Sequence, residues 1–307
     1  MSVAAVDLGA RYYGKEGIRL LVVGPSDGGP GMVYEQRMSV LLHEGLDESY
    51  LAGDNTRLVT SDAQRSLAVR IAMELAGEPV EETALEIGEE ICRRYPFVPE
   101  VEVGLARRPW TAMVMAEPSC ASGHGFVCDG SEEQVSRVTV SGVGRKIVSG
   151  IEGLRLLLTT GSRFEGFVSD DLTPNEPVAD RAIAGDLSVH WVPTSPGVDF
   201  PALRSSLRGV VMSAFQGVRS ESVQHLLTSM CAETIQKVSE VERVVLRFES
   251  IALGMVQGGP EAGDGVQSSR MREARAHTMI ELPRAVTSVS MERGTSVPTR
   301  RSSAAAC

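Results

Sequence analysis

A chain of 307 residues with 42% hydrophobic content is long enough for one large domain or for two domains of ordinary size. Its net charge of −10 disfavours a nucleic-acid backbone or an anionic membrane surface as the main partner. Five cysteines without a CxxC pair indicate neither a zinc ribbon nor a disulfide framework, and with no signal-like or membrane-spanning stretch they favour a cytoplasmic protein.

The first part of the chain predicts strands on both sides of a helix pair. Two apolar runs flank a Gly/Pro/Asp-rich stretch, a pattern typical of paired strands. Apolar residues at helical spacing then predict two amphipathic helices, and short apolar runs follow as returning strands. The expected order is strand, strand, helix, helix, strand, strand at residues 18–23, 32–42, 64–76, 83–95, 101–103 and 110–115.

A similar pattern of strands and a helix pair recurs further along the chain. Strand-like runs precede two segments of helical spacing, and another strand-like run follows them. These elements are expected at residues 138–140, 154–158, 187–192, 200–215, 222–238 and 241–248. Two copies of one unit, each an antiparallel sheet with a helix pair on one face, predict an α+β fold of tandem domains. We expect the domains at residues 1–135 and 136–292, with a disordered tail at 293–307.

The stretch from Thr159 to Arg181 contains the residues most suggestive of a ligand. Phe164 stands between glycine and serine residues, and Arg181 could reach the same place. An aromatic ring offers a surface for stacking, and a guanidinium offers a planar fork of donors. Together these groups suit a flat heterocycle whose edge accepts hydrogen bonds.

Several short motifs in one order carry a family resemblance. They are Ala10-Arg11-Tyr12-Tyr13-Gly14-Lys15, Gly53-Asp54-Asn55, Thr60-Ser61-Asp62, His124-Gly125-Phe126, Ser162 to Phe167 with Asp180-Arg181, and Ser222-Val223-Gln224. Their order and spacing resemble urate oxidase (uricase), a cofactor-free enzyme of the tunnelling fold (T-fold), over nearly all of the chain to about Phe248. The resemblance implies a homotetramer with active sites between subunits, O2 as co-substrate, and neither a cofactor nor a metal. The five histidines also lack the spacing of a zinc site.

The resemblance also assigns the binding residues. Phe164 matches the ring that stacks on the purine, and Arg181 with Gln224 matches the pair that grips its pyrimidine edge. Val223 matches the neighbour whose backbone contacts the same edge.

A second set matches the proton relay that the other subunit supplies. Lys15 matches the relay lysine, and Ser61 with Asp62 matches the Thr-Asp step at the five-membered edge. Thr60 is the alternative source of the relay hydroxyl, because a slip of one residue would place it there. A lysine acts as a base only where burial or a neighbouring cation lowers its pKa.

The chain departs from the family where oxygen is handled. Ser250 stands at the position of an asparagine that holds oxygen or water over the purine, and Ala252 stands at the position of the relay histidine. Alanine cannot relay a proton. We therefore expect an O2-dependent oxidase or oxygenase that acts on urate or on a related oxidised purine such as 8-oxoguanine. Such an enzyme would serve a specialised metabolic pathway. A purine-binding homologue without turnover is the alternative.

Overall fold

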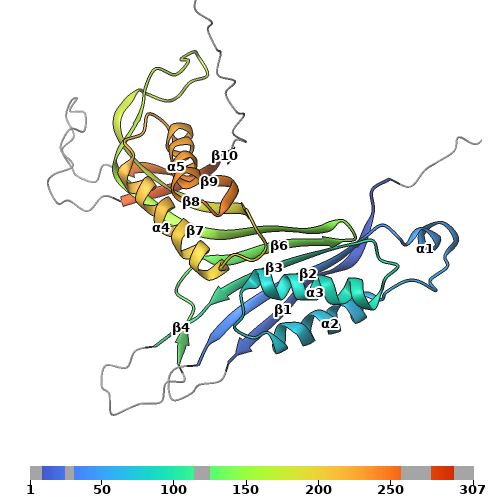
Figure 1. The fold of residues 1–307 in the computed structure, drawn as a ribbon. Coiled ribbons are helices and arrows are strands. Elements are labelled where there is room, and N and C mark those ends of the chain that lie inside the picture. The colour runs from blue at the N-terminus through green and yellow to red at the C-terminus, as the bar shows by residue number, and fades with distance from the viewer. Residues whose placement is uncertain (1–8, 25–30, 114–124, 257–277, 294–307) are drawn as a thin grey trace, which may run out of the picture.

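The computed structural model describes residues 9–24, 31–113, 125–256 and 278–293, and their main feature is one eight-stranded antiparallel sheet (Figure 1). In sheet order its strands are β1 (Tyr12–Val23), β2 (Val33–His43), β3 (Glu100–Pro109), β6 (Glu133–Ser141), β7 (Gly144–Phe164), β8 (Val178–Pro193), β9 (Val241–Val256) and β10 (Thr278–Glu292). The helices are α1 (Asp47–Ala52), α2 (Ser61–Glu74), α3 (Val80–Arg94), α4 (Phe200–Gly217) and α5 (Val223–Lys237).

Each half of the sheet has its own helix pair and its own core. In the first half, α2 and α3 pack on β1, β2, β3 and β6, and Val40, Ile87 and Val103 are fully buried between them. In the second half, α4 and α5 cover β7 to β10 around Trp191, Leu207 and other buried residues. This arrangement confirms the α+β class.

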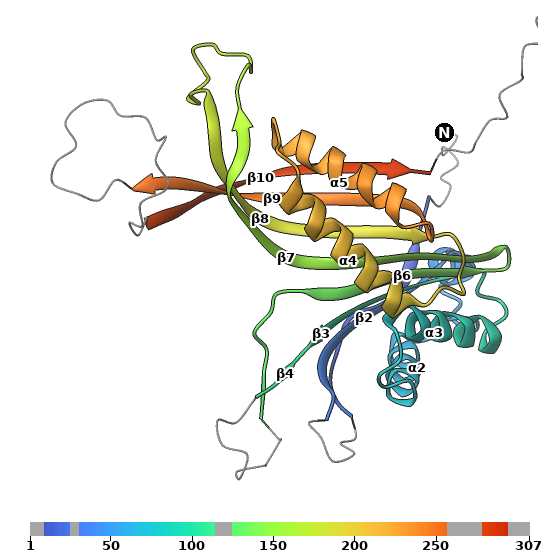
Figure 2. The ribbon, with the colours of Figure 1, turned by 60° about the vertical axis from the view of Figure 1, so that its left-hand side comes forward.

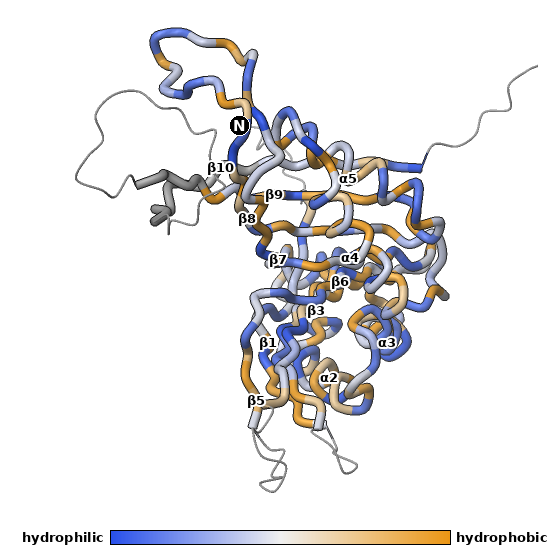
Figure 3. The backbone as a smooth tube through the Cα atoms, turned by 90° about the vertical axis from the view of Figure 1, so that its left-hand side faces the viewer, coloured by the Kyte–Doolittle hydropathy of each residue, from blue (hydrophilic) through white to orange (hydrophobic). Residues whose placement is uncertain are grey.

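Local sequence explains where three of these helices begin. Thr60, Asp199 and Ser222 each accept a hydrogen bond from a backbone N–H three residues later, which is the geometry of a side-chain N-cap. Strand β8 alternates buried and half-buried residues, with Leu187, Val189 and Trp191 facing the helices. Figure 3 shows the corresponding alternation of hydropathy along the strands.

One expected strand is wrong. The expected strand at residues 110–115 is not the fourth strand of the first half. Within its described part, residues 110–113, only Thr111–Ala112 (β4) is a strand, and it pairs with Phe126–Val127 (β5) in a separate two-stranded sheet. The fourth strand is β6, whose Val138 and Val140 belong to the first core. We therefore propose that the two units divide at the turn 142–143, while the expected boundary at 135/136 stays a prediction.

Strand β10 was not expected from the sequence, and it closes the second half of the sheet by pairing with β9. Most of the expected tail, residues 294–307, lies outside the described residues, as does His124. Within the described residues, none of the helices combines the length and hydropathy needed to span a membrane.

A buried ion pair joins the two halves on the helix side of the sheet. The Arg204 guanidinium on α4 lies 2.5 Å from the Glu81 carboxylate on α3, and the residues are 7% and 0% exposed. Phe200, also on α4, packs into the first core. The first turns of α4 therefore act as the link between the halves (Figure 2).

We expect Glu81→Gln to lower the free energy of unfolding by about 3–5 kcal/mol, because it leaves the buried Arg204 charge uncompensated. The matched control is Glu132→Gln, which removes the partner of Arg208 from a pair whose side chains are 31% and 43% exposed. That change should cost less than about 1 kcal/mol. Urea unfolding of the two variants measures the difference, and equal losses would contradict this role of the buried pair.

Candidate active site

The end of β7 and the start of β8 bring Phe164 and Arg181 together. Ser162 pairs with Arg181 and Phe164 with Val178, after register shifts on both sides of Ser162. The guanidinium carbon of Arg181 lies 4.7 Å from the centre of the Phe164 ring. This distance is within the range of a cation–π interaction.

Asp180 fixes the irregular backbone that presents Phe164. Its carboxylate accepts hydrogen bonds from the Thr160 hydroxyl at 2.5 Å and from the Gly161 N–H at 2.7 Å. Gly161 has a φ of 94°, which glycine adopts without the strain that a side chain would cause. The carboxylate therefore holds the bend in β7 just before the ring.

Arg181 is partly withdrawn from water, and none of the described residues forms an ion pair with it. Burial lowers the pKa of its guanidinium, and its buried Nε has no hydrogen-bond partner among the described residues. A guanidinium in this condition gains from an anionic or hydrogen-bond-accepting ligand.

The start of α5 is attached directly to the same bend. Ser220 accepts a hydrogen bond from the Arg163 N–H at 2.9 Å and donates its own N–H to the Gly161 carbonyl at 3.0 Å. Helix α5 begins three residues later with Val223 and Gln224. All four expected clamp residues therefore lie on segments joined by backbone hydrogen bonds, near the hairpin between β7 and β8.

Arg163 adds a second connection between these segments. Its guanidinium lies 2.9 Å from the carboxylate of Glu165, just after Phe164, and 2.9 Å from that of Glu221, just before α5. The sequence reasoning did not single out this contact, nor the role of Asp180. Both depend on the pairing of segments that are distant in the chain.

The expected relay residues form a second group at the start of α2. The Lys15 ammonium lies 3.5 Å from the Asp62 carboxylate, and these side chains are 40% and 75% exposed. The Tyr13 hydroxyl accepts a hydrogen bond from the Ser61 N–H at 3.1 Å. Thr60 caps the helix through its hydroxyl, which favours Ser61 over Thr60 as the relay hydroxyl.

The two groups are far apart within one chain. Across the sheet, Lys15 pairs with Val40, and the same row of paired residues continues through β3 and β6 to Ile147 on β7. Ser162 lies fifteen residues further along β7 (162 − 147 = 15), which corresponds to about 50 Å of strand. In Figure 1 the β7–β8 hairpin extends at the upper left, whereas α2 lies at the lower right.

The altered positions lie on β9. Ser250 is half-buried and pairs with Gly185, four residues along β8 from Arg181. Ala252 is the backbone partner of Leu282 on β10. Strand β9 therefore runs beside the strand that carries Arg181.

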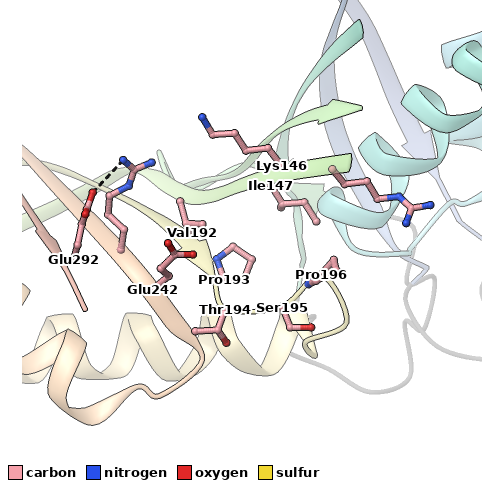
Figure 4. Close-up of a pocket in the computed structure, with 11 residues that line it drawn as sticks. Lys146, Ile147, Val192, Pro193, Thr194, Ser195, Pro196, Glu242 and Glu292 are labelled. Atoms are coloured by element: carbon pink, nitrogen blue, oxygen red, sulfur yellow. Dashed lines mark hydrogen bonds and ion pairs between the residues drawn. The ribbon is translucent and has the colours of Figure 1, made fainter. Parts of the chain in front are cut away.

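A separate cavity of about 410 Å³ opens at the other end of β7 and β8. None of the expected site residues lines it. Its lining includes Lys146, Pro193, Thr194, Glu242 and Glu292 (Figure 4). Within the described residues, no group of three His, Cys, Asp or Glu side chains is arranged to hold a metal ion.

The Asp180 contacts predict a pH response. The hydrogen bond from Thr160, and then that from Gly161, lower the pKa of Asp180 below its ordinary value of 3.8. A lowered pKa means that the stabilising charge is present above pH 3.8 and is lost only as the pH falls through the lower folded value. We expect the Gly161 amide resonance to titrate with a midpoint below 3.8, and not to titrate in Asp180→Asn. A midpoint above 3.8 would contradict the assignment.

Comparison with known proteins shows which family the chain resembles. A family model described as Uricase matches residues 147–274. The uricase of Arthrobacter globiformis is 28% identical over 276 residues, 90% of this chain and 89% of that protein. The uricase of Arabidopsis thaliana is 30% identical over 234 residues, 71% of this chain and 74% of that protein.

Solved structures agree with this result. The crystal structure of the Arthrobacter globiformis uricase matches with a TM-score of 0.81 and 24% identity, covering 96% of this chain and 97% of that one. A uricase from Bacillus fastidious matches with a TM-score of 0.76 and 18% identity, covering 92% and 93%. The expected T-fold is confirmed. The chain belongs to the uricase family, whose members are cofactor-free and use O2 as co-substrate.

Proposed function

We propose that this chain oxidises a purine with O2, in a site that two copies of the chain form together. The purine is urate or a related 8-oxopurine such as 8-oxoguanine. The ring of Phe164 supports the heterocycle, and Arg181, Gln224 and the backbone of Val223 hold its edge. Lys15, Ser61 and Asp62 of a second copy approach the opposite edge. The assembly is a homotetramer in the cytoplasm.

The observation that carries the proposal is the pairing of Arg181 with Phe164. A guanidinium 4.7 Å from a ring centre, with no anionic partner among the described residues, suits a planar anion. Hydrogen bonds between charged groups are worth about 1.5–3 kcal/mol each. The same arrangement would bind a neutral aliphatic ligand poorly, because such a ligand neither stacks nor accepts two parallel bonds.

A second copy is needed to complete the site. About 50 Å of strand separates the row of Lys15 from Ser162, beside the purine clamp, a span that no purine can bridge. Strands β1 and β10 also end the sheet, so each has an unpaired edge within the described chain. Such edges are places where a further copy can add its strands. Lys15, 40% exposed in one chain, would become buried there, as a base requires.

The chemistry follows from the ligand itself. An electron-rich purine anion can pass two electrons to O2, and two protons complete the reduction to hydrogen peroxide. The protein then has to bind the anion, accept protons and hold oxygen over the ring. Arg181 and Gln224 perform the first task, and Lys15 with Ser61 accepts protons.

The altered residues on β9, Ser250 and Ala252, affect which purine the chain can oxidise. Ser250 offers a shorter donor than asparagine, and Ala252 offers none. Loss of one positioned donor typically costs about 10²–10³-fold in rate, so the chain is poorly equipped for the usual course of urate oxidation. We therefore propose that a 2-amino or otherwise altered 8-oxopurine is the better substrate, in a specialised pathway. Because a 2-amino group is a donor and would face the donors of Arg181, that purine must bind flipped or as another tautomer.

The same observation favours the second candidate function. A chain with intact clamp residues and altered oxygen-side residues could bind purines without oxidising them. It would then act as a sensor or as a partner subunit. Tight purine binding without O2 consumption is the result that distinguishes this function from catalysis.

The test is O2 uptake by metal-free protein with urate, 8-oxoguanine and xanthine, with mass spectrometry of the products. We expect 8-oxoguanine to be oxidised faster than urate. The double variant Ser250→Asn/Ala252→His should raise urate turnover at least about 10²-fold, because it restores a positioned donor and a proton relay.

Two results would contradict the proposal. Rapid urate turnover by the natural sequence, unchanged in the double variant, would show that Ser250 and Ala252 do not limit the reaction. No turnover of any purine, together with tight binding, would support the purine-binding function instead.

A further inference from the structure

A second aromatic ring stands against the ring expected to support the purine. The centres of Phe164 and Phe167 are 4.6 Å apart, and their planes differ by 18°, which is a stacked arrangement. Only Glu165 and Gly166 separate the two residues. Gly166 has a φ of 72°, a conformation that lets the chain turn back so sharply.

Phe164 therefore has two close neighbours. The Arg181 guanidinium carbon is 4.7 Å from the ring centre, and the Phe167 ring is 4.6 Å from it. Two planar groups of this size would overlap if both covered one face of a phenyl ring at these distances. We infer that they occupy opposite faces.

Because the Phe167 ring covers the other face, a purine stacks on the Arg181 face once the guanidinium moves from above the Phe164 ring to the edge of the purine. We propose that Phe167 is a positioning residue, which supports the back of the Phe164 ring while the purine stacks on its front. This inference rests on the proposed function, and it assigns a role that the family resemblance did not give to Phe167.

The surroundings of Phe167 support this role. The intervening turn is held by the contact of Arg163 with Glu165 at 2.9 Å, and Arg163 also reaches Glu221 before α5. Phe167 itself is half-buried, whereas Val168 and Leu172 further along the hairpin are 85% and 84% exposed. Of these three apolar side chains, Phe167 is therefore the one that is partly withdrawn from water, and its ring stacks on Phe164.

The consequence is a specific effect on binding. Without its neighbour, the Phe164 ring can rotate and tilt, and the purine loses a fixed surface. A stacked aromatic pair contributes enough that its loss should weaken binding about 3- to 10-fold. Turnover of the bound purine should not change, because Phe167 touches neither the purine nor the relay residues.

The experiment compares Phe167→Leu, Phe167→Tyr and the control Leu172→Ala, which alters an exposed residue of the same hairpin. Calorimetry gives the Kd for urate and for 8-oxoguanine, and O2 uptake gives KM and kcat. We expect Phe167→Leu to raise Kd and KM about 3- to 10-fold without a change in kcat. Phe167→Tyr should restore both values, and Leu172→Ala should match the natural sequence. Thermal unfolding checks that all variants fold.

Each other outcome overturns the inference. Equal binding by Phe167→Leu and the natural sequence would overturn it alone and leave the proposed function intact. Tighter binding by Phe167→Leu would show that Phe167 occupies the face needed by the purine. Absence of purine binding by the natural sequence would overturn both the inference and the proposed function.

Discussion

The continuous register of one antiparallel sheet determines where each candidate residue can lie. Every strand of the eight-stranded sheet is hydrogen-bonded to its neighbours, so the row that contains Lys15 passes through β7 at Ile147 and not near Phe164. Curvature of the sheet can bend this path, but it cannot bring fifteen residues of extended strand to one point. We therefore propose that the two groups of candidate residues are two half-sites, which a second copy of the chain would bring to one ligand.

The half-site around Phe164 is the better supported of the two. Asp180 holds the bend in β7, Ser220 joins that bend to the segment before α5, and Arg163 connects both. These contacts hold the backbone that carries Phe164 before any ligand arrives. Preorganisation of this kind lowers the entropy that binding must overcome. The Lys15 half-site is more exposed and depends on its partner for burial.

The altered positions lie within the Phe164 half-site, because Ser250 and Ala252 are on β9, beside the strand that carries Arg181. By the resemblance of the motifs, the residues for holding a planar anion match the family, whereas Ser250 and Ala252 on β9 do not. A changed position beside an unchanged clamp favours a change of substrate or of reaction course over a loss of ligand binding. The ring pair of Phe164 and Phe167 fits this view, because it strengthens the binding half and leaves the reaction steps untouched.

The sequence predicted the helices α2, α3, α4 and α5, since apolar periodicity is a local signal, but it did not predict the short α1. It misplaced the fourth strand because a short apolar run such as 110–115 does not reveal its partner, and β6 is identified by its packing on α3. Motif order was sufficient to name Phe164, Arg181 and Lys15. The contacts of Asp180 and Arg163 could not be predicted, since they arise from bulges and from pairing between distant segments.

Mixing of two defective variants tests the shared site most directly. Lys15→Met disables one half-site and Arg181→Gln disables the other, so each variant alone should lose nearly all O2 uptake. In an assembly formed from equal amounts of both, about a quarter of the sites combine two intact halves. The account predicts that co-expression restores O2 uptake to about that fraction of the natural level. No recovery in assemblies proven to contain both variants would contradict it.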